Sequence, residues 1–182
     1  MSDKSGKVQD LIDKKFLEER KVFLNGQVDG KSAKHIIDRL MYLDMESNDE
    51  IQFYINSPGG YVTDGFAIYD TMKGLKSPVS TICCGLAASM GSILMSGGEK
   101  GKRFIQPHAK IMIHQPMGGA QGQASNIEIQ AKEILKIKEL SAQILADNCG
   151  QDLDKVMKDF KRDHWMDAQE SLDYGIVDGI LS

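Results

Sequence analysis

The chain lacks both a basic surplus and a long apolar run. Its 26 acidic side chains outnumber 22 basic ones, which gives a net charge of −4 at pH 7. Nucleic-acid affinity comes mainly from clustered Lys and Arg, and a membrane span needs ~20 consecutive apolar residues. The opening residues MSDKSGKVQD also lack the apolar core of a signal peptide. We therefore expect a cytoplasmic protein that binds neither nucleic acid nor membranes.

Cysteine is scarce as well. The three cysteines, Cys83, Cys84 and Cys149, cannot all pair, and two adjacent residues of a strand point to opposite faces. No spacing typical of metal ligands links them to the four histidines. We expect reduced packing residues, and neither a metal nor a cofactor in this chain.

The residues that are present predict one globular α/β domain over residues 1–182. The hydrophobic fraction of 41% and the charged fraction of 26% are ordinary for such a domain. Strand-like and helix-like segments alternate, which is typical of a largely parallel sheet. The expected helices cover residues 8–19, 32–43, 63–75 and 125–148, with Ser32 as the cap of the second and two short helices near the end. The expected strands cover residues 21–24, 51–56, 79–84, 103–105 and 109–114, with a short one at the end of the chain.

The first candidate for chemistry is Ser89 in GLAASMGSIL, where a strand breaks and a helix begins. Exposed N–H groups and the helix dipole at such a turn favour negative charge, which suits a nucleophilic hydroxyl. The N–H of Met90 then faces the oxyanion of a tetrahedral intermediate. The commoner role for a serine at this place is a helix N-cap. Ser89 is flanked at two positions by Ala87 and Gly91, so Ala87 stands where the Gly-x-Ser-x-Gly elbow has its first glycine, which disfavours an α/β-hydrolase.

Two further motifs follow the ends of predicted strands. INSPGG ends in Gly60, whose N–H is a candidate second oxyanion donor, although a plain turn explains the motif equally well. IMIHQP places His114 at the end of an apolar strand, as either a general base or a core histidine. Enzymes with parallel sheets hold their sites at these carboxyl ends, which favours the functional interpretation of both.

A base of this kind needs an acid that orients it, and KRDHWM supplies Asp163. Asp163 lies in a break between helices beside Trp165, where burial would hold a carboxylate against an imidazole. The alternative is a helix-cap or surface aspartate. His164 is a rival base, but its place next to the acid makes it point elsewhere.

Together, INSPGG, GLAASMGS, PHAKIMIHQP, GQASNIEIQAKEIL and KRDHWM resemble the proteolytic subunits of Clp proteases, the ClpP family. The resemblance runs from about residue 20 to residue 181. It implies Ser89 as the nucleophile, His114 as the general base and Asp163 as the residue that orients it. The same resemblance places the oxyanion donors at the N–H groups of Gly60 and Met90.

The resemblance also implies a fold and partners. The fold is a crotonase-like spiral of β-β-α units, with a handle strand and helix at about residues 117–148 that joins two stacked rings of seven subunits. The implied function is a serine endopeptidase of protein quality control that degrades unfolded polypeptides. They are delivered by an AAA+ unfoldase such as ClpX, ClpA or ClpC. ATP belongs to that unfoldase, because this chain has no phosphate-binding loop.

The chain departs from the family pattern in three places. Residues 1–19 match the usual N-terminal segment poorly, and Gln52 and Gly74 stand where the pocket for unfoldase loops is often aromatic. Before the catalytic acid, Lys161 and Arg162 replace an acidic residue and an arginine, so an ion pair between rings becomes a repulsion. We therefore hypothesise that the chain is one of two paralogues in a mixed assembly.

Three other functions compete with this one. The first is a catalytically silent or partner-activated structural subunit of the ring. The second is an acyl-CoA enzyme of the crotonase type, which needs no serine beside a histidine. The third is a membrane-anchored peptidase with a Ser-Lys dyad, disfavoured because His114 stands where that enzyme would have lysine.

Overall fold

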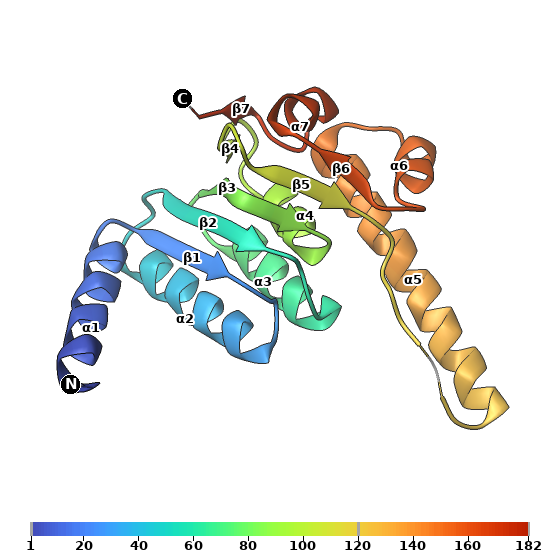
Figure 1. Cartoon of the computed structure of the whole chain (residues 1–182), viewed down its shortest axis with the longest axis horizontal. Coiled ribbons are helices and arrows are strands. Elements are labelled where there is room, and N and C mark those ends of the chain that lie inside the picture. Colours follow the sequence, from blue (N-terminus) through green and yellow to red (C-terminus); the bar gives the residue numbers. More distant parts are fainter. Residues whose placement is uncertain (1, 120, 182) are drawn as a thin grey trace.

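The computed structural model describes residues 2–119 and 121–181, in which helices and strands alternate along the chain (Figure 1). The helices are α1 (Ser2–Glu18), α2 (Gly30–Glu46), α3 (Val62–Gly74), α4 (Met90–Ser96), α5 (Ala124–Cys149), α6 (Leu153–Asp159) and α7 (Ala168–Tyr174). The strands are β1 (Lys21–Asn25), β2 (Ile51–Ser57), β3 (Val79–Ala88), β4 (Arg103–Ile105), β5 (Lys110–Ile113), β6 (His164–Met166) and β7 (Gly179–Ile180).

The sheet is largely parallel, as the alternation of elements predicts. Its main path runs β1-β2-β3-β4-β7, and β5 leaves that path because it pairs with β3 and β6. The ten-residue strand β3 serves two partners on one side: its first half pairs with β4 and its last three residues pair with β5. Only β6 among the described strands runs antiparallel, against β5. The α/β fold class is confirmed.

Helices α2, α3 and α4 lie together along one side of the sheet (Figure 1), and their buried apolar residues pack with those of the strands in the hydrophobic core. The cap of α2 differs from the prediction, because Asp29 and not Ser32 is the N-cap residue. The Asp29 carboxylate accepts a hydrogen bond from the Ser32 N–H at 2.8 Å, and the Ser32 hydroxyl accepts one from the Asp29 N–H at 2.9 Å. The prediction took the N3 residue of this reciprocal capping box for the cap, because serine is itself a preferred N-cap residue.

The segments at residues 1–19 and 117–148 both contain the helix that was expected, but each differs from the prediction in one respect. The first is α1, which begins six residues before the predicted start and packs Phe16 on Phe23 with ring centroids 4.5 Å apart. The second contains the predicted handle helix, α5, whose outer half extends away from the rest of the molecule (Figure 1).

The handle strand predicted ahead of α5 is not formed in the single chain, in which residues 117–119 and 121–123 are not strand and Ala120 lies outside the described residues. A strand needs a neighbouring backbone to bond with, and no other strand of the described chain pairs with this glycine-rich segment.

Helix α5 is apolar on more than its buried side. Its exposed large apolar residues are Ile127, Ile129, Leu135 and Leu140.

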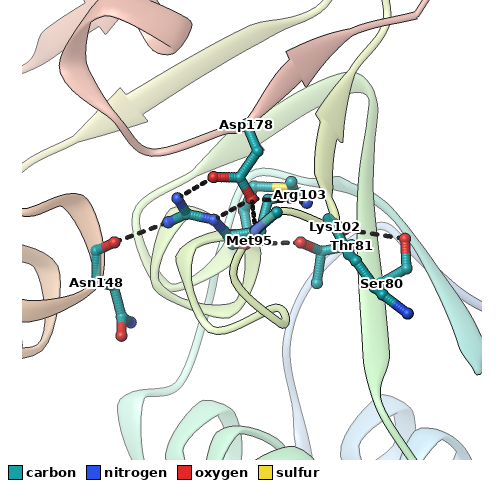
Figure 2. A network of polar contacts seen from close by, with 8 residues as sticks. Ser80, Thr81, Met95, Lys102, Arg103, Asn148 and Asp178 are labelled. Carbon is teal, nitrogen blue, oxygen red and sulfur yellow. Dashed lines mark hydrogen bonds and ion pairs between the residues drawn. The ribbon is translucent and has the colours of Figure 1, made fainter.

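A buried arginine ties the far end of the sheet to α5 (Figure 2). Arg103 on β4 is 3% exposed, and its Nε and Nη2 atoms lie 2.8 and 2.5 Å from the two carboxylate oxygens of Asp178. Its Nη1 donates to the backbone carbonyl of Asn148 in the last turn of α5 at 2.8 Å. Beside it, the Thr81 hydroxyl donates to the Met95 carbonyl at 2.8 Å, which fastens the end of α4 to β3. The Arg103 side chain therefore joins β4 to Asp178 and to the end of α5, two segments that are distant from it in the sequence.

Replacing Asp178 with Asn should destabilise the protein strongly, because it leaves the Arg103 charge buried without its counter-ion. We expect the free energy of unfolding, measured by urea titration at pH 7, to fall by about 3 kcal/mol. Burial acts to raise the pKa of Asp178, but hydrogen bonds from Arg103 outweigh it and lower that pKa. A lowered pKa stabilises the folded state at neutral pH, so the difference between variant and wild type should shrink below about pH 4.

The matched control is Glu50→Gln, which breaks the partly exposed ion pair between Glu50 and Lys102, whose charged atoms lie 2.6 Å apart. An exposed ion pair contributes less than about 1 kcal/mol, so this variant should unfold close to the wild type. Equal losses in the two variants would contradict a special role for the buried pair.

Candidate active site

Ser89 lies at the junction between β3 and α4 with an unusual backbone conformation. Its φ of 54° and ψ of −123° make it one of two non-glycine residues with positive φ among the described residues. Its N–H donates to the Met112 carbonyl of β5 at 2.9 Å, which fixes this conformation against the sheet. Such strained residues persist only where the surroundings determine them, and they gather at functional sites.

The Ser89 side chain faces a histidine and does not cap the helix. Although Ser89 occupies the N-cap position of α4, its hydroxyl makes no capping hydrogen bond. Its Oγ lies 2.8 Å from Nε2 of His114, the residue directly after β5. The alternative role as a side-chain cap is therefore wrong, and His114, with 11% of its side chain exposed, is not a plain core histidine.

The other ring nitrogen of His114 meets Asp163. The distance from His114 Nδ1 to Asp163 Oδ1 is 3.0 Å. Strand β6 explains this meeting, since its antiparallel register pairs Ile113 with His164 and so brings the preceding Asp163 opposite the following His114. With its proton on Nδ1, the imidazole donates to Asp163 and accepts the hydroxyl proton of Ser89, which is the hydrogen-bond order of a Ser-His-Asp hydrolase.

The surroundings of Asp163 differ from the prediction. Its side chain is 60% exposed, and Trp165 beside it is 50% exposed, so burial does not hold the carboxylate in place. Two hydrogen bonds from Gln115 hold this loop: its N–H donates to the Phe160 carbonyl at 2.8 Å, and its side-chain amide donates to the Lys161 carbonyl at 3.3 Å. The sequence did not predict β6, because a strand of three residues is too short to show a periodic pattern. It did not predict the two Gln115 hydrogen bonds either, because they depend on that strand pairing.

The rival base His164 is not part of this constellation. Its ring lies against Tyr174, with centroids 5.8 Å apart. The cysteines are free thiols, and burial is the main cause that raises the pKa of Cys83 and of Cys149 to about 12. A thiol with so high a pKa is a poor nucleophile. In the described part of the chain, no three His, Cys, Asp or Glu side chains gather where a metal ion would fit.

The glycine turn after β2 packs directly on the serine. A Cβ at Gly59, whose φ is +90°, would lie 2.7 Å from both the Ala88 carbonyl oxygen and the Ser89 Cβ, so only glycine fits there. Gly60 forms a parallel bridge with Val28 through the Gly59 carbonyl and the Tyr61 N–H, which leaves its own N–H out of that bridge.

Met90, the other predicted oxyanion donor, is the first residue of α4. Its N–H is the first of the helix, where no carbonyl of a preceding turn is in place to accept it. Its side chain is buried and lies over Gly65 of α3, where a Cβ would come within 2.1 Å of the Met90 Cγ atom. The glycine turn packs on this helix start as well as on Ser89, since a Cβ at Gly59 would lie 2.9 Å from the Met90 backbone nitrogen.

Fold and site together have the form of a serine hydrolase on a largely parallel sheet, with His114 and Ser89 after strand ends. A family model described as Clp protease matches residues 3–182 of the chain. The chain belongs to the Clp protease family, and is therefore a protease of the ClpP type. None of the described helices is both long and apolar enough to cross a bilayer.

The strained backbone of Ser89 predicts that glycine will be more stable than alanine at this position, the reverse of the usual order in a helix. Ser89→Ala keeps the penalty of positive φ, whereas Ser89→Gly relieves it, and both lose the same hydroxyl. We expect the Gly variant to be more stable than the Ala variant by about 1 kcal/mol in urea unfolding.

Ser92, inside α4, is the control for this comparison. There Ala should be more stable than Gly by about 1 kcal/mol, because glycine is unfavourable in a helix. The same order at both positions would rule out stored strain at Ser89.

Proposed function

We propose that the chain is a single-domain serine endopeptidase that degrades unfolded polypeptides through a covalent acyl-enzyme. The observation that carries the proposal is the continuous chain of hydrogen bonds from Ser89 through His114 to Asp163 in a member of the Clp protease family. Ser89 is the nucleophile, His114 the general base and Asp163 the residue that orients the imidazole.

Acylation begins when the Ser89 Oγ attacks the scissile carbonyl carbon and His114 Nε2 takes the hydroxyl proton. The carboxylate of Asp163 keeps the imidazole in the tautomer that accepts this proton, and it stabilises the imidazolium that forms. The N–H groups of Gly60 and Met90 bind the oxyanion of the tetrahedral intermediate. Their preorganisation by the packing around Gly59 and Gly65 supports this role.

The intermediate collapses when the C–N bond breaks and His114 gives its proton to the leaving amine. A water molecule then loses a proton to His114 and attacks the acyl-enzyme at the same carbonyl carbon. The second intermediate releases the new carboxyl terminus and returns the proton to Ser89. No cofactor of this chain takes part in either half of the cycle.

Ser89→Ala should abolish peptide hydrolysis and covalent labelling by a fluorophosphonate, since both need the hydroxyl. Asp163→Asn should lower kcat by about 10⁴-fold at neutral pH, because it favours the wrong imidazole tautomer. Hydrolysis is measured with a fluorogenic peptide, and the labelled residue is identified by peptide mass spectrometry.

Ser96→Ala is the control, because Ser96 is buried in the same helix and bonds no residue of the site: its hydroxyl donates to the Ile93 carbonyl at 2.8 Å and accepts from the Asn148 side-chain amide at 3.0 Å. It should keep both activities. Labelling at a residue other than Ser89 would contradict the assignment, and rapid turnover of an acyl-CoA by Ser89→Ala would favour crotonase-type chemistry instead.

Assembly into stacked heptameric rings is part of the proposal. The exposed apolar residues of the outer half of α5, such as Ile129 at 60% exposure, support a contact with a second ring. An AAA+ unfoldase, which consumes the ATP, would deliver the unfolded substrate to the chamber between the rings.

The same reasoning supports a mixed assembly with a paralogous subunit. Lys161 and Arg162 are exposed beside Asp163 and have no ion-pair partner among the described residues, so identical chains would oppose like charges at this loop. A second feature concerns the pocket that would receive the unfoldase loops. There the Tyr54 hydroxyl donates to the Gln52 side chain at 3.1 Å, and Gly74 has no side chain to contribute. A paralogue that supplies carboxylates and aromatic docking residues would remedy both features.

The mixed assembly predicts that the pure chain will not form a stable fourteen-mer by itself. Native mass spectrometry should show smaller species, and peptidase activity should rise when the paralogue is added. Lys161→Glu should shift the pure chain towards larger rings, because it restores an opposite charge. A fourteen-mer of the pure wild-type chain that is fully active with an unfoldase would refute this hypothesis.

A partner-activated or silent ring subunit remains the second candidate. The 60% exposure of the Asp163 side chain favours it, because an exposed carboxylate orients an imidazole less firmly than a buried one. Fluorophosphonate labelling of the pure chain and of the mixed assembly separates these functions. Ser89 is labelled in both states in a peptidase that is active by itself, only in the mixed assembly in a partner-activated subunit, and in neither state in a silent subunit.

A further inference from the structure

Ser57, the last residue of β2, lies beneath the proposed oxyanion site and is completely buried. The parallel pairing of β2 with β3 shifts its register just before Ser57, so that Ser57 pairs with Ala87, two residues before Ser89. A polar side chain in such a place needs a hydrogen-bond partner, because burial without one is costly.

The hydroxyl of Ser57 finds that partner in the glycine turn. Its Oγ accepts a hydrogen bond from the Gly59 N–H at 3.0 Å. A hydroxyl that bonds the N–H two residues later closes a local turn, and here it fixes the residue whose Cα packs on Ser89. The position of Gly60, the next residue, follows from that of Gly59.

The backbone of Ser57 contacts the other side of the site. A Cβ at Gly91 would lie 3.1 Å from the Ser57 carbonyl oxygen and 3.5 Å from the Ser57 Cβ. Gly91 follows Met90 in the first turn of α4. Ser57 therefore contacts both segments that carry the proposed oxyanion donors, through its hydroxyl on one side and its backbone on the other.

We infer that Ser57 is a positioning residue, which holds the N–H groups of Gly60 and Met90 at the separation that a tetrahedral oxyanion requires. The inference rests on the proposed peptidase function. Donors of this kind act only when they lie about 2.7–3.1 Å from the oxyanion, so a small shift of the glycine turn weakens them. Among the described residues the Ser57 hydroxyl bonds the Gly59 N–H and none of the triad side chains, so it acts through Gly59.

Ser57→Ala tests the inference, because it removes the acceptor of the Gly59 N–H without adding volume. In the assembly in which the wild type is active, we expect kcat to fall by about 10- to 100-fold with KM changed less than about 2-fold. The affinity for a peptide aldehyde that forms a tetrahedral adduct with Ser89 should fall by the same factor as kcat/KM. The pH–rate profile should keep its shape, since the triad is untouched.

Ser80→Ala is the matched control. Ser80 is a buried residue of the neighbouring strand β3, 2% exposed, and its hydroxyl donates to the Lys102 carbonyl at 2.9 Å, away from the site. It should shift the urea midpoint as Ser57→Ala does, yet keep kcat and the affinity for the aldehyde. Ser57→Cys, with a similar volume and a weak acceptor, should lie between the wild type and Ser57→Ala, and it takes over the test if Ser57→Ala does not fold.

Unchanged kcat and aldehyde affinity in the folded Ser57 variants would overturn the inference while leaving the peptidase function intact. An equal loss of aldehyde affinity in Ser80→Ala would also overturn it, because the effect would then belong to general destabilisation. A wild type that neither hydrolyses peptides nor labels at Ser89 would overturn the proposed function, and this inference with it.

Discussion

The division of β3 between two partners is the constraint on which the rest of the structure depends. Because β4 pairs with its first half and β5 with Leu86–Ala88, the end of β3 is held beside the end of β5. The hydrogen bond from the Ser89 N–H to the Met112 carbonyl extends this pairing by one residue. A shift of one residue in this register would turn the serine away from His114, since side chains of a strand alternate between faces.

The site combines residues that follow parallel strands with one residue that precedes an antiparallel strand. Gly59, Ser89 and His114 follow the carboxyl ends of β2, β3 and β5, which parallel pairing brings to one edge of the sheet. Asp163 comes from the opposite direction, because it precedes the antiparallel strand β6. The nucleophile and the base therefore sit on the rigid sheet, whereas the acid sits on an exposed loop held by Gln115.

Two parts of the molecule have very different degrees of burial. At one end, Arg103 and Asp178 form a closed polar network that fixes α5 to the sheet (Figure 2). At the other end, the outer half of α5 and the loop of Lys161 to Asp163 are exposed in the single chain. This contrast fits the proposed assembly, in which neighbouring subunits would cover the exposed half of α5 and the loop that carries Asp163.

The sequence by itself determined the α/β class, the long helix α5 and the residue types at Ser89, His114 and Asp163. These follow from local patterns: hydrophobic periodicity, glycine turns, and polar residues at the ends of apolar strands. The tertiary structure alone decided that Ser89 faces His114, 25 positions away, and that His114 meets Asp163, 49 positions away. It also decided the antiparallel strand β6, the exposure of Asp163, and the place of Ser57 beneath the glycine turn. Hydrogen bonds between distant segments depend on strand register, and register depends on how the whole sheet packs, which no local pattern contains.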